Sequence, residues 1–189
     1  MVVSFGVKPQ LVGKLVTLRP VTVADAPGLV ELLHDPEVRR LTGTPGRPRP
    51  GTLQRAEQWY RDCASAEDRL DLAIVERAGG TYVGEVALAD LDAGNRSCSF
   101  RISLVGPRAF GRGYGSEATR LTLGHAFDTV GLHRVELEVY ESNPRARHVY
   151  ERAGFVHEGT KREALHQDGA WIDAHQLAVL ASDRPDLTT

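Results

Sequence analysis

A run of glycines between an apolar stretch and a helical pattern is the part of this sequence best suited to chemistry. Gly111, Gly113 and Gly115 alternate within it. Residues 100–104 before the run read as a strand, and residues 116–129 after it have helical spacing. The first N–H groups of a helix lack intrahelical acceptors, and the helix dipole favours an anion beside them. Glycines also let the backbone approach a phosphate closely. The run therefore predicts an anion site or, in the blander interpretation, a flexible loop that only begins a helix.

The same glycines partly match the G-x-G-x-x-G fingerprint of dinucleotide-binding proteins. Gly111 and Gly113 fit, Ser116 stands in place of the third glycine, and Glu136 is an acidic residue at a suitable distance. Against this interpretation, the run follows an antiparallel meander, whereas the fingerprint opens a parallel β-α-β unit. A nicotinamide-dependent oxidoreductase is therefore one alternative function.

A second group of residues follows about thirty positions later. Asn143 and Pro144 fit the N-cap and first position of a helix, and Gly154 fits its end, followed by Phe155. Tyr150 lies within this helix. A phenol donates a proton at neutral pH, so this tyrosine is either a candidate general acid or a core-packing side chain.

The elements that must position these residues alternate in type and predict a mixed α/β sheet, antiparallel early and helix-connected late. We expect strands over residues 14–19, 70–76, 81–91, 96–104, 133–140, 155–159 and 171–180. We expect helices over residues 23–34, 36–41, 52–66, 116–129 and 143–153. Residues 14–182 should form a single domain, preceded by an N-terminal arm (1–13) and followed by a polar tail (183–189).

Composition narrows the class of protein. The 189 residues carry a net charge of −2, which gives no indication of nucleic-acid binding. Cys63 and Cys98 lie far apart in no metal-binding pattern, so we expect no metal and a reducing compartment. No apolar run approaches the ~20 residues of a membrane span, and the first residues do not resemble a signal peptide. We therefore expect a cytoplasmic protein with no membrane association.

Residues 42–52 are rich in proline and glycine and predict a loop. Arg47 and Arg49 make this loop basic. The loop is either a solvated connector or a substrate-facing lid, in which these arginines recognise an acidic group.

The glycine run and the later group together resemble the GNAT superfamily of acetyl-CoA-dependent N-acetyltransferases. The resemblance rests on residues 110–118, Asn143, Tyr150 and residues 154–155, in this order and spacing. The edges of the chain, Leu18-Arg19-Pro20 with Asp25-Ala26 and Trp171-x-Asp173, are similar to the ribosomal-protein N-terminal acetyltransferase (RimJ/RimL-type) subgroup. The resemblance implies a mixed, mostly antiparallel sheet flanked by helices and splayed between its fourth and fifth strands, in a monomer or a homodimer.

The resemblance also implies a set of residues that bind acetyl-CoA. The glycine loop wraps the pyrophosphate through Gly111, Arg112, Gly113, Tyr114, Gly115 and Ser116. The backbone of the preceding strand binds the pantetheine arm at Ile102, Ser103 and Leu104, and Asn143 contacts the same arm. Phe110 departs from the Gln or Arg that the family places there for pyrophosphate binding. We therefore expect the loop amides to contribute more, with charge supplied by Arg108 or Arg112.

The implied reaction is direct attack of an amine on the thioester in a ternary complex. Tyr150 is the predicted general acid, because the leaving thiolate needs a proton. Glu136 and Glu138 are candidates for the general base, and Glu85 is a further candidate on the acceptor side. The acceptor is a protein N-terminus or a small-molecule amine. A non-catalytic acyl-CoA-binding sensor is the second alternative, because of the departure at Phe110.

Overall fold

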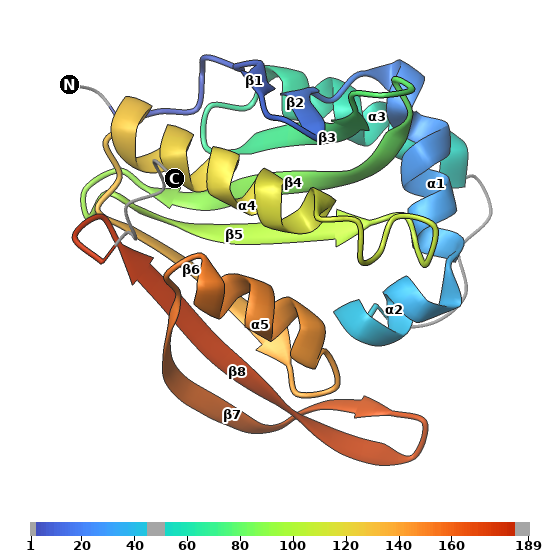
Figure 1. Ribbon diagram of the computed structural model, residues 1–189, viewed down its shortest axis with the longest axis vertical. Helices are drawn as coiled ribbons and strands as arrows, with labels where there is room; N and C mark the ends of the chain where they lie inside the picture. The colour runs from blue at the N-terminus through green and yellow to red at the C-terminus, as the bar shows by residue number, and fades with distance from the viewer. Residues whose placement is uncertain (1–2, 45–51, 184–189) are drawn as a thin grey trace.

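An eight-stranded sheet forms the centre of the protein, and the computed structural model describes residues 3–44 and 52–183 (Figure 1). The strand order is β1-β2-β3-β4-β5-β6-β8-β7. All neighbouring strands are antiparallel except β5 and β6, which are parallel. The strands are β1 (Leu11–Val12), β2 (Val16–Pro20), β3 (Leu70–Glu76), β4 (Tyr82–Asp92), β5 (Ser97–Leu104), β6 (Arg134–Tyr140), β7 (Val156–Gln167) and β8 (Ala170–Leu180).

Helices cover both faces of this sheet. They are α1 (Ala26–His34), α2 (Pro36–Thr42), α3 (Thr52–Ser65), α4 (Tyr114–Gly124) and α5 (Pro144–Arg152), with a 3-10 turn at Val23–Asp25 and a π-helical turn at His125–Thr129. Strand β3 shows how the faces divide, since alternate side chains point to opposite sides. Leu72 and Ile74 pack with Leu123 of α4, whereas Ala73 packs with residues of α1 and α3. Among the described residues, every helix is too short or too polar to cross a membrane.

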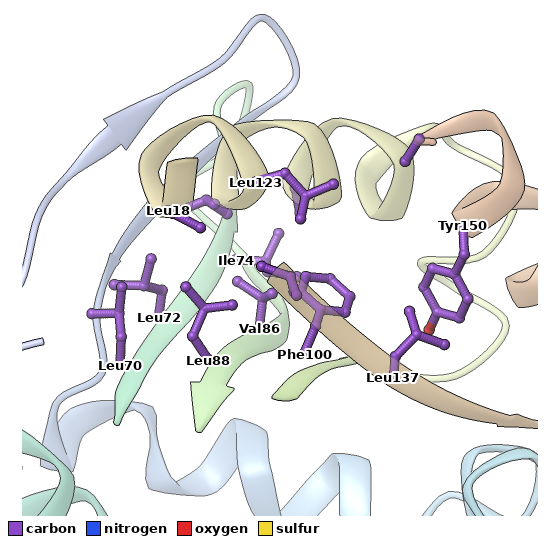
Figure 2. Packing of buried hydrophobic residues seen from close by; sticks show 14 of the residues in the cluster. Leu18, Leu70, Leu72, Ile74, Val86, Leu88, Phe100, Leu123, Leu137 and Tyr150 are labelled. Atoms are coloured by element: carbon purple, nitrogen blue, oxygen red, sulfur yellow. The ribbon is translucent and has the colours of Figure 1, made fainter. Parts of the chain in front are cut away.

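The larger core cluster extends across the sheet from β2 to β5 and β6 (Figure 2). Leu18, Ile74 and Val86 line its middle, and Phe100 and Tyr150 belong to the same cluster. Each buried aliphatic side chain contributes about 1.5–3 kcal/mol relative to its exposure to water. The apolar core therefore fixes the strand that leads into the glycine loop.

The parallel pair β5–β6 is joined for only part of its length. Its register runs from Ser97 opposite Arg134 to Ser99 opposite Glu136 and then stops. Beyond these residues β5 continues to Leu104 and β6 to Tyr140, so each strand presents an unpaired edge to the other. This separation agrees with the splay predicted between the fourth and fifth strands, which were counted without the short β1.

The first residues of the chain differ from the predicted N-terminal arm. Phe5 is only 1% exposed and belongs to the main core, and β1 pairs with β2. The turn between β1 and β2 is held by Glu117 of α4, whose carboxylate accepts backbone N–H groups of Lys14, Leu15 and Val16 at 2.7–2.8 Å. Residue 13 is therefore no structural boundary. Strand β1 has only two residues and Phe5 is a single apolar residue, so neither shows the hydrophobic periodicity from which elements are predicted.

An ion pair accounts for the motif near the start of the chain. The guanidinium of Arg19 donates to both carboxylate oxygens of Asp25 at 2.7 Å. Asp25 also accepts hydrogen bonds from the backbone and hydroxyl of Thr22 at 2.9 Å. These contacts connect β2 to α1 through the 3-10 turn, where the sequence predicted one continuous helix.

Two other elements have bounds that differ from those predicted. Helix α4 begins at Tyr114 rather than Ser116, and β7 continues to Gln167 rather than ending near Gly159. Strand β7 is largely exposed along its length, so it lacks the buried alternation by which strands are recognised. The predicted fold class, a mostly antiparallel mixed sheet flanked by helices, is confirmed.

Candidate functional site

Two cavities border the gap between β5 and β6. The helix-side cavity has a volume of about 120 Å³ and is lined by residues of α2, β5, α4 and α5. The strand-side cavity has a volume of about 750 Å³ and is lined mainly by β5, β6 and the β7–β8 hairpin. Six residues line both: Leu41, Thr42, Ile102, Ser103, Asn143 and Tyr150. The two cavities therefore meet where the strands separate.

The loop between β5 and α4 has the backbone shape that its glycines permit. Gly111 and Gly113 have φ angles of 73° and 83°, in the left-handed region that other side chains disfavour. Gly113 is the N-cap of α4. Within the described part of the chain, the backbone N–H groups of residues 111–116 have no hydrogen-bond acceptor. Such a row of free donors at a helix start fits a phosphate group.

Strand β5 supplies the wall next to this loop. Ile102, Ser103 and Leu104 line the helix-side cavity, and they lie beyond the last residue that pairs with β6. Backbone groups on this edge of the strand have no sheet partner and are open to an extended ligand. The three residues that the resemblance assigned to the pantetheine arm thus lie beside the glycine loop.

Helix α2 borders the gap between β5 and β6, a position that the sequence did not predict. Leu41 and Thr42 line both cavities. The N-cap of this helix, Asp35, accepts the backbone N–H of Val38 at 2.8 Å. Its carboxylate also lies against the glycine loop, because a Cβ added at Gly106 would be 2.2 Å from an oxygen of Asp35. Proline at the first position made the helix predictable, but its position over the gap depends on these distant contacts.

The charged residues of the glycine loop are already paired. Arg108 donates to both carboxylate oxygens of Glu31 at 2.8 and 2.9 Å. Arg112 lies 3.2 Å from Glu76, which also accepts a hydrogen bond from the hydroxyl of Tyr114. Neither arginine lines the helix-side cavity. The expectation that one of them supplies charge there is therefore not supported by their positions.

Asn143 lies at the start of α5, where the sequence placed it. Its side-chain oxygen accepts the backbone N–H of Ala146 at 3.1 Å, which makes it the N-cap. The residue also lines both cavities. Capping fixes the side chain at the junction, so the structural role and the predicted ligand role are compatible.

Tyr150 lies at the junction of the two cavities and is 8% exposed. Its ring packs edge-on against Phe100 and Phe155, with centroids 6.0 and 5.8 Å away. Figure 2 shows the ring directed from α5 towards β6, near Leu137. Among the described residues its hydroxyl has no hydrogen-bond partner. Burial raises the pKa of Tyr150, so the phenol stays protonated and available as a donor.

The strand-side cavity is lined by charges that are mutually neutralised. Glu136 and Glu138 lie on one face of β6, as the alternating pattern predicted. Arg134 contacts Glu136 at 3.0 Å and Glu158 of β7 at 2.6 Å. Lys161 of β7 contacts Glu138 at 2.6 Å. The two predicted base candidates therefore share the cavity with Tyr150, but each already has a cationic partner.

Glu85 lies outside both cavities. Its carboxylate accepts a hydrogen bond from the hydroxyl of Tyr60 on α3 at 2.8 Å, and burial raises its pKa. Glu85 is nevertheless paired in register with Ser103, which lines both cavities, so its acceptor-side role stays a prediction. Arg47 and Arg49 of the predicted lid lie outside the described residues.

The position of Glu136 does not fit the ribose-binding acid of a dinucleotide site. Strands β5 and β6, which α4 connects, are in fact parallel, although the sequence indicated an antiparallel meander before the glycine run. However, Glu136 stands near the beginning of β6 and faces Ser99, far from the glycine loop that follows Leu104. A ribose-binding acid belongs at the carboxyl end of the second strand.

Comparisons with known proteins agree with this geometry. The family model described as the acetyltransferase (GNAT) domain matches residues 16–156. The chain belongs to the GNAT family. This membership confirms the resemblance found in the sequence, and it removes the dinucleotide alternative.

Several individual proteins resemble this GNAT chain. Spermidine N(1)-acetyltransferase of Vibrio cholerae is 32% identical over 109 residues, which span 58% of this chain and 62% of that protein. The putative ribosomal N-acetyltransferase YdaF of Bacillus subtilis is 31% identical over 101 residues, or 53% of this chain and 55% of that protein. The matched segment thus covers less than two thirds of these relatives.

Solved structures show the same fold over more of the chain. Vibrio cholerae spermidine N-acetyltransferase in complex with CoA and spermine superposes with a TM-score of 0.80 and 23% identity. The match covers 90% of this chain and 98% of that one. At this identity the likeness establishes the fold.

Proposed function

We propose that the protein transfers an acetyl group from acetyl-CoA to a primary amine by direct attack in a ternary complex. The observation that carries this proposal is the position of Tyr150, whose protonated hydroxyl has no partner in the described chain and lies where two cavities meet. One cavity offers a row of free amides next to an unpaired strand edge. The other is wide and polar enough for an acceptor.

In this proposal the helix-side cavity binds the cofactor. The N–H groups of residues 111–116 hold the pyrophosphate, and the free edge of residues 102–104 holds the pantetheine arm in an extended form. Asn143 contacts the arm from the start of α5. Bound acetyl-CoA supplies an activated thioester, whose carbonyl oxygen is polarised by backbone N–H groups of β5.

The strand-side cavity admits the amine. The nitrogen attacks the acetyl carbon, the C–S bond breaks, and Tyr150 donates its proton to the departing sulfur. The ammonium proton leaves through water, because Glu136 and Glu138 are occupied by Arg134 and Lys161. The phenol is then reprotonated from solvent, which completes the proton balance.

The charges of the strand-side cavity favour one class of acceptor. Among the residues that the structure describes, three carboxylates line it (Glu136, Glu138 and Glu158), together with three cations (Arg101, Arg134 and Lys161). Because the charges are balanced, the cavity lacks the excess negative charge that would select a polycation. We propose a primary amine with no further cationic group, such as a protein N-terminus or a small monoamine.

A polyamine is the second candidate acceptor. It is favoured by the similarity to spermidine acetyltransferases, one of which has a solved complex with CoA and spermine. Its binding would require a rearrangement of the ion pairs that now neutralise the cavity carboxylates.

A panel of amines separates these possibilities. Thiol release from acetyl-CoA is measured with a peptide bearing a free N-terminus, an amino-acid amide and spermidine, and the products are weighed by mass spectrometry. We expect the first two to give the higher kcat/KM. Preference for spermidine would favour the second candidate. Tight acetyl-CoA binding with no transfer to any amine would instead favour a sensor.

A further inference from the structure

Phe110 leaves the cofactor cavity without the polar side chain that the family resemblance places at this position. The ring is half-buried and packs against the main core while lining the helix-side cavity. It therefore offers neither a hydrogen bond nor a charge to a phosphate. The loop arginines do not compensate, since Arg108 and Arg112 are bound to Glu31 and Glu76.

One other cation reaches this cavity. Arg145, in the first turn of α5, is the one charged residue among the described residues that line the helix-side cavity. Its guanidinium carbon lies 5.0 Å from the centroid of the Phe110 ring. A guanidinium at this distance from an aromatic ring is held by a cation–π interaction. The ring thus serves as a platform that positions the cation beside the loop.

Two further observations indicate that the guanidinium of Arg145 is available to bind an anion. In the described chain, no carboxylate lies within ion-pair distance of Arg145. Its neighbour on the same helix, Arg147, is paired with Glu151. The acid of α2, Glu37, feels the charge of Arg145, but its carboxylate accepts its hydrogen bonds from Arg40. The first turn of a helix also disfavours a cation, because the dipole is positive there. An unpaired arginine at such a place has an electrostatic cost that a bound phosphate would offset.

We infer that Arg145 binds a phosphate group of coenzyme A and replaces the side chain lost at position 110. The charge approaches the ligand from α5 rather than from the loop, and Phe110 holds the guanidinium in place. This inference rests on the proposed function, since it concerns the same cofactor cavity. It assigns a binding role to a residue that neither the sequence motifs nor the family comparison marked.

Calorimetry with the full-length protein tests the role directly. We expect Arg145→Met to raise the Kd for coenzyme A by about 10- to 100-fold, as expected for the loss of a hydrogen-bonded charge pair. The Kd should also become less sensitive to salt. Pantetheine, which lacks phosphates, should bind both proteins equally. Arg147→Met is the matched control and should leave both Kd values unchanged.

A rescue experiment excludes a merely structural effect. Adding Phe110→Arg to the Arg145→Met variant restores a cation beside the loop and should recover most of the lost affinity. Dephospho-coenzyme A identifies the phosphate: an effect that persists with it assigns the pyrophosphate, and one that disappears assigns the 3′-phosphate. Equal loss for pantetheine, or unchanged coenzyme A affinity in Arg145→Met, would overturn the inference. Failure of the wild type to bind coenzyme A would instead reject the proposed function.

Discussion

The two cavities that meet at Tyr150 differ in the kind of groups that line them. The helix-side cavity is small and mostly apolar, and the binding groups that its described residues offer are backbone amides and Arg145, which has no ion-pair partner among them. The strand-side cavity is larger and is lined by six charged side chains, with Glu136, Glu138 and Glu158 already paired. Backbone groups suit a ligand that is always the same, whereas side chains can be exchanged to suit a particular acceptor.

Tyr150 lines both cavities, and its hydroxyl is the proposed proton donor. Removal of the hydroxyl alone should therefore slow the reaction while leaving the binding of both substrates nearly unchanged. We expect Tyr150→Phe to lower kcat by about 100-fold or more, the scale of a lost general acid, while the Kd for acetyl-CoA stays within about twofold. Because burial raises the pKa of this phenol, the loss should be constant between neutral and mildly alkaline pH. Stopped assays over this range measure it.

Tyr140→Phe is the control for this variant, because Tyr140 lines only the strand-side cavity. It should retain most of its kcat. Full turnover in Tyr150→Phe would show that the junction of the cavities is not the catalytic point.

Helix α4, which lines the helix-side cavity, is joined to the β1–β2 turn through Glu117. Burial of Glu117 opposes its charge, but backbone N–H groups of Val16, Leu15 and Lys14 outweigh this and lower its pKa. We expect Glu117→Gln to lose about 2 kcal/mol of unfolding free energy at pH 7. A lowered pKa means that this contribution is present above the unfolded value of 4.5 and disappears as the pH falls through the folded one.

Urea denaturation at pH 7 and near pH 4 measures this difference. The stability gap between wild type and Glu117→Gln should narrow in acid. Glu57→Gln removes an exposed pair with Arg61 and should cost less than about 1 kcal/mol at either pH. A gap that widens in acid would contradict the assignment.

Gly111 in the glycine loop and Gly131, which lies outside it between the π-helical turn and β6, form a matched pair for testing the contribution of the loop backbone. Gly111 and Gly131 both have positive φ, 73° and 78°, and a Cβ at either would meet no atom within 4 Å. Alanine at each should therefore cost about 1–2 kcal/mol of stability. Only Gly111→Ala should also weaken coenzyme A binding, by about tenfold in calorimetry. Equal Kd values in the two variants would mean that the loop amides do not bind the cofactor.

The smallest effect concerns acceptor choice. Lys161→Gln frees the carboxylate of Glu138 and gives the strand-side cavity an excess of negative charge. We expect the ratio of kcat/KM for spermidine to that for a monoamine to rise by about threefold, since exposed pairs contribute little. Arg61→Gln, far from the cavity, should leave the ratio unchanged. An unchanged ratio for Lys161→Gln would show that balanced charge does not set specificity.

The same contrast explains what the sequence could and could not predict. The glycine loop, the cap at Asn143 and the place of Tyr150 on its helix follow from local rules of φ angles, caps and periodicity, and the structure brings all three together. The pairing of Glu138 with Lys161 could not be foreseen, because Lys161 comes from β7, more than twenty residues away. For the same reason, the sequence did not indicate that Arg134, the partner of Glu136, is shared with Glu158 of β7. The binding role of Arg145 could not be predicted, because it depends on the contact of its guanidinium with the distant ring of Phe110. Likewise, the burial of Glu85 under α3 is a tertiary contact without a local signal.

The early end of pairing between β5 and β6 has a thermodynamic consequence. Backbone groups beyond Ser99 and Glu136 on the facing edges are not protected by the sheet. Their amide hydrogens should therefore exchange with solvent faster than those of β3, although β5 is a central strand. A ligand that binds only the folded state adds about 2.7 kcal/mol of stability at a hundred times its Kd. Hydrogen exchange at residues 102–104 should then slow on saturation with cofactor, so that one segment of backbone reports both the occupancy of the cavity and the stability of the whole domain.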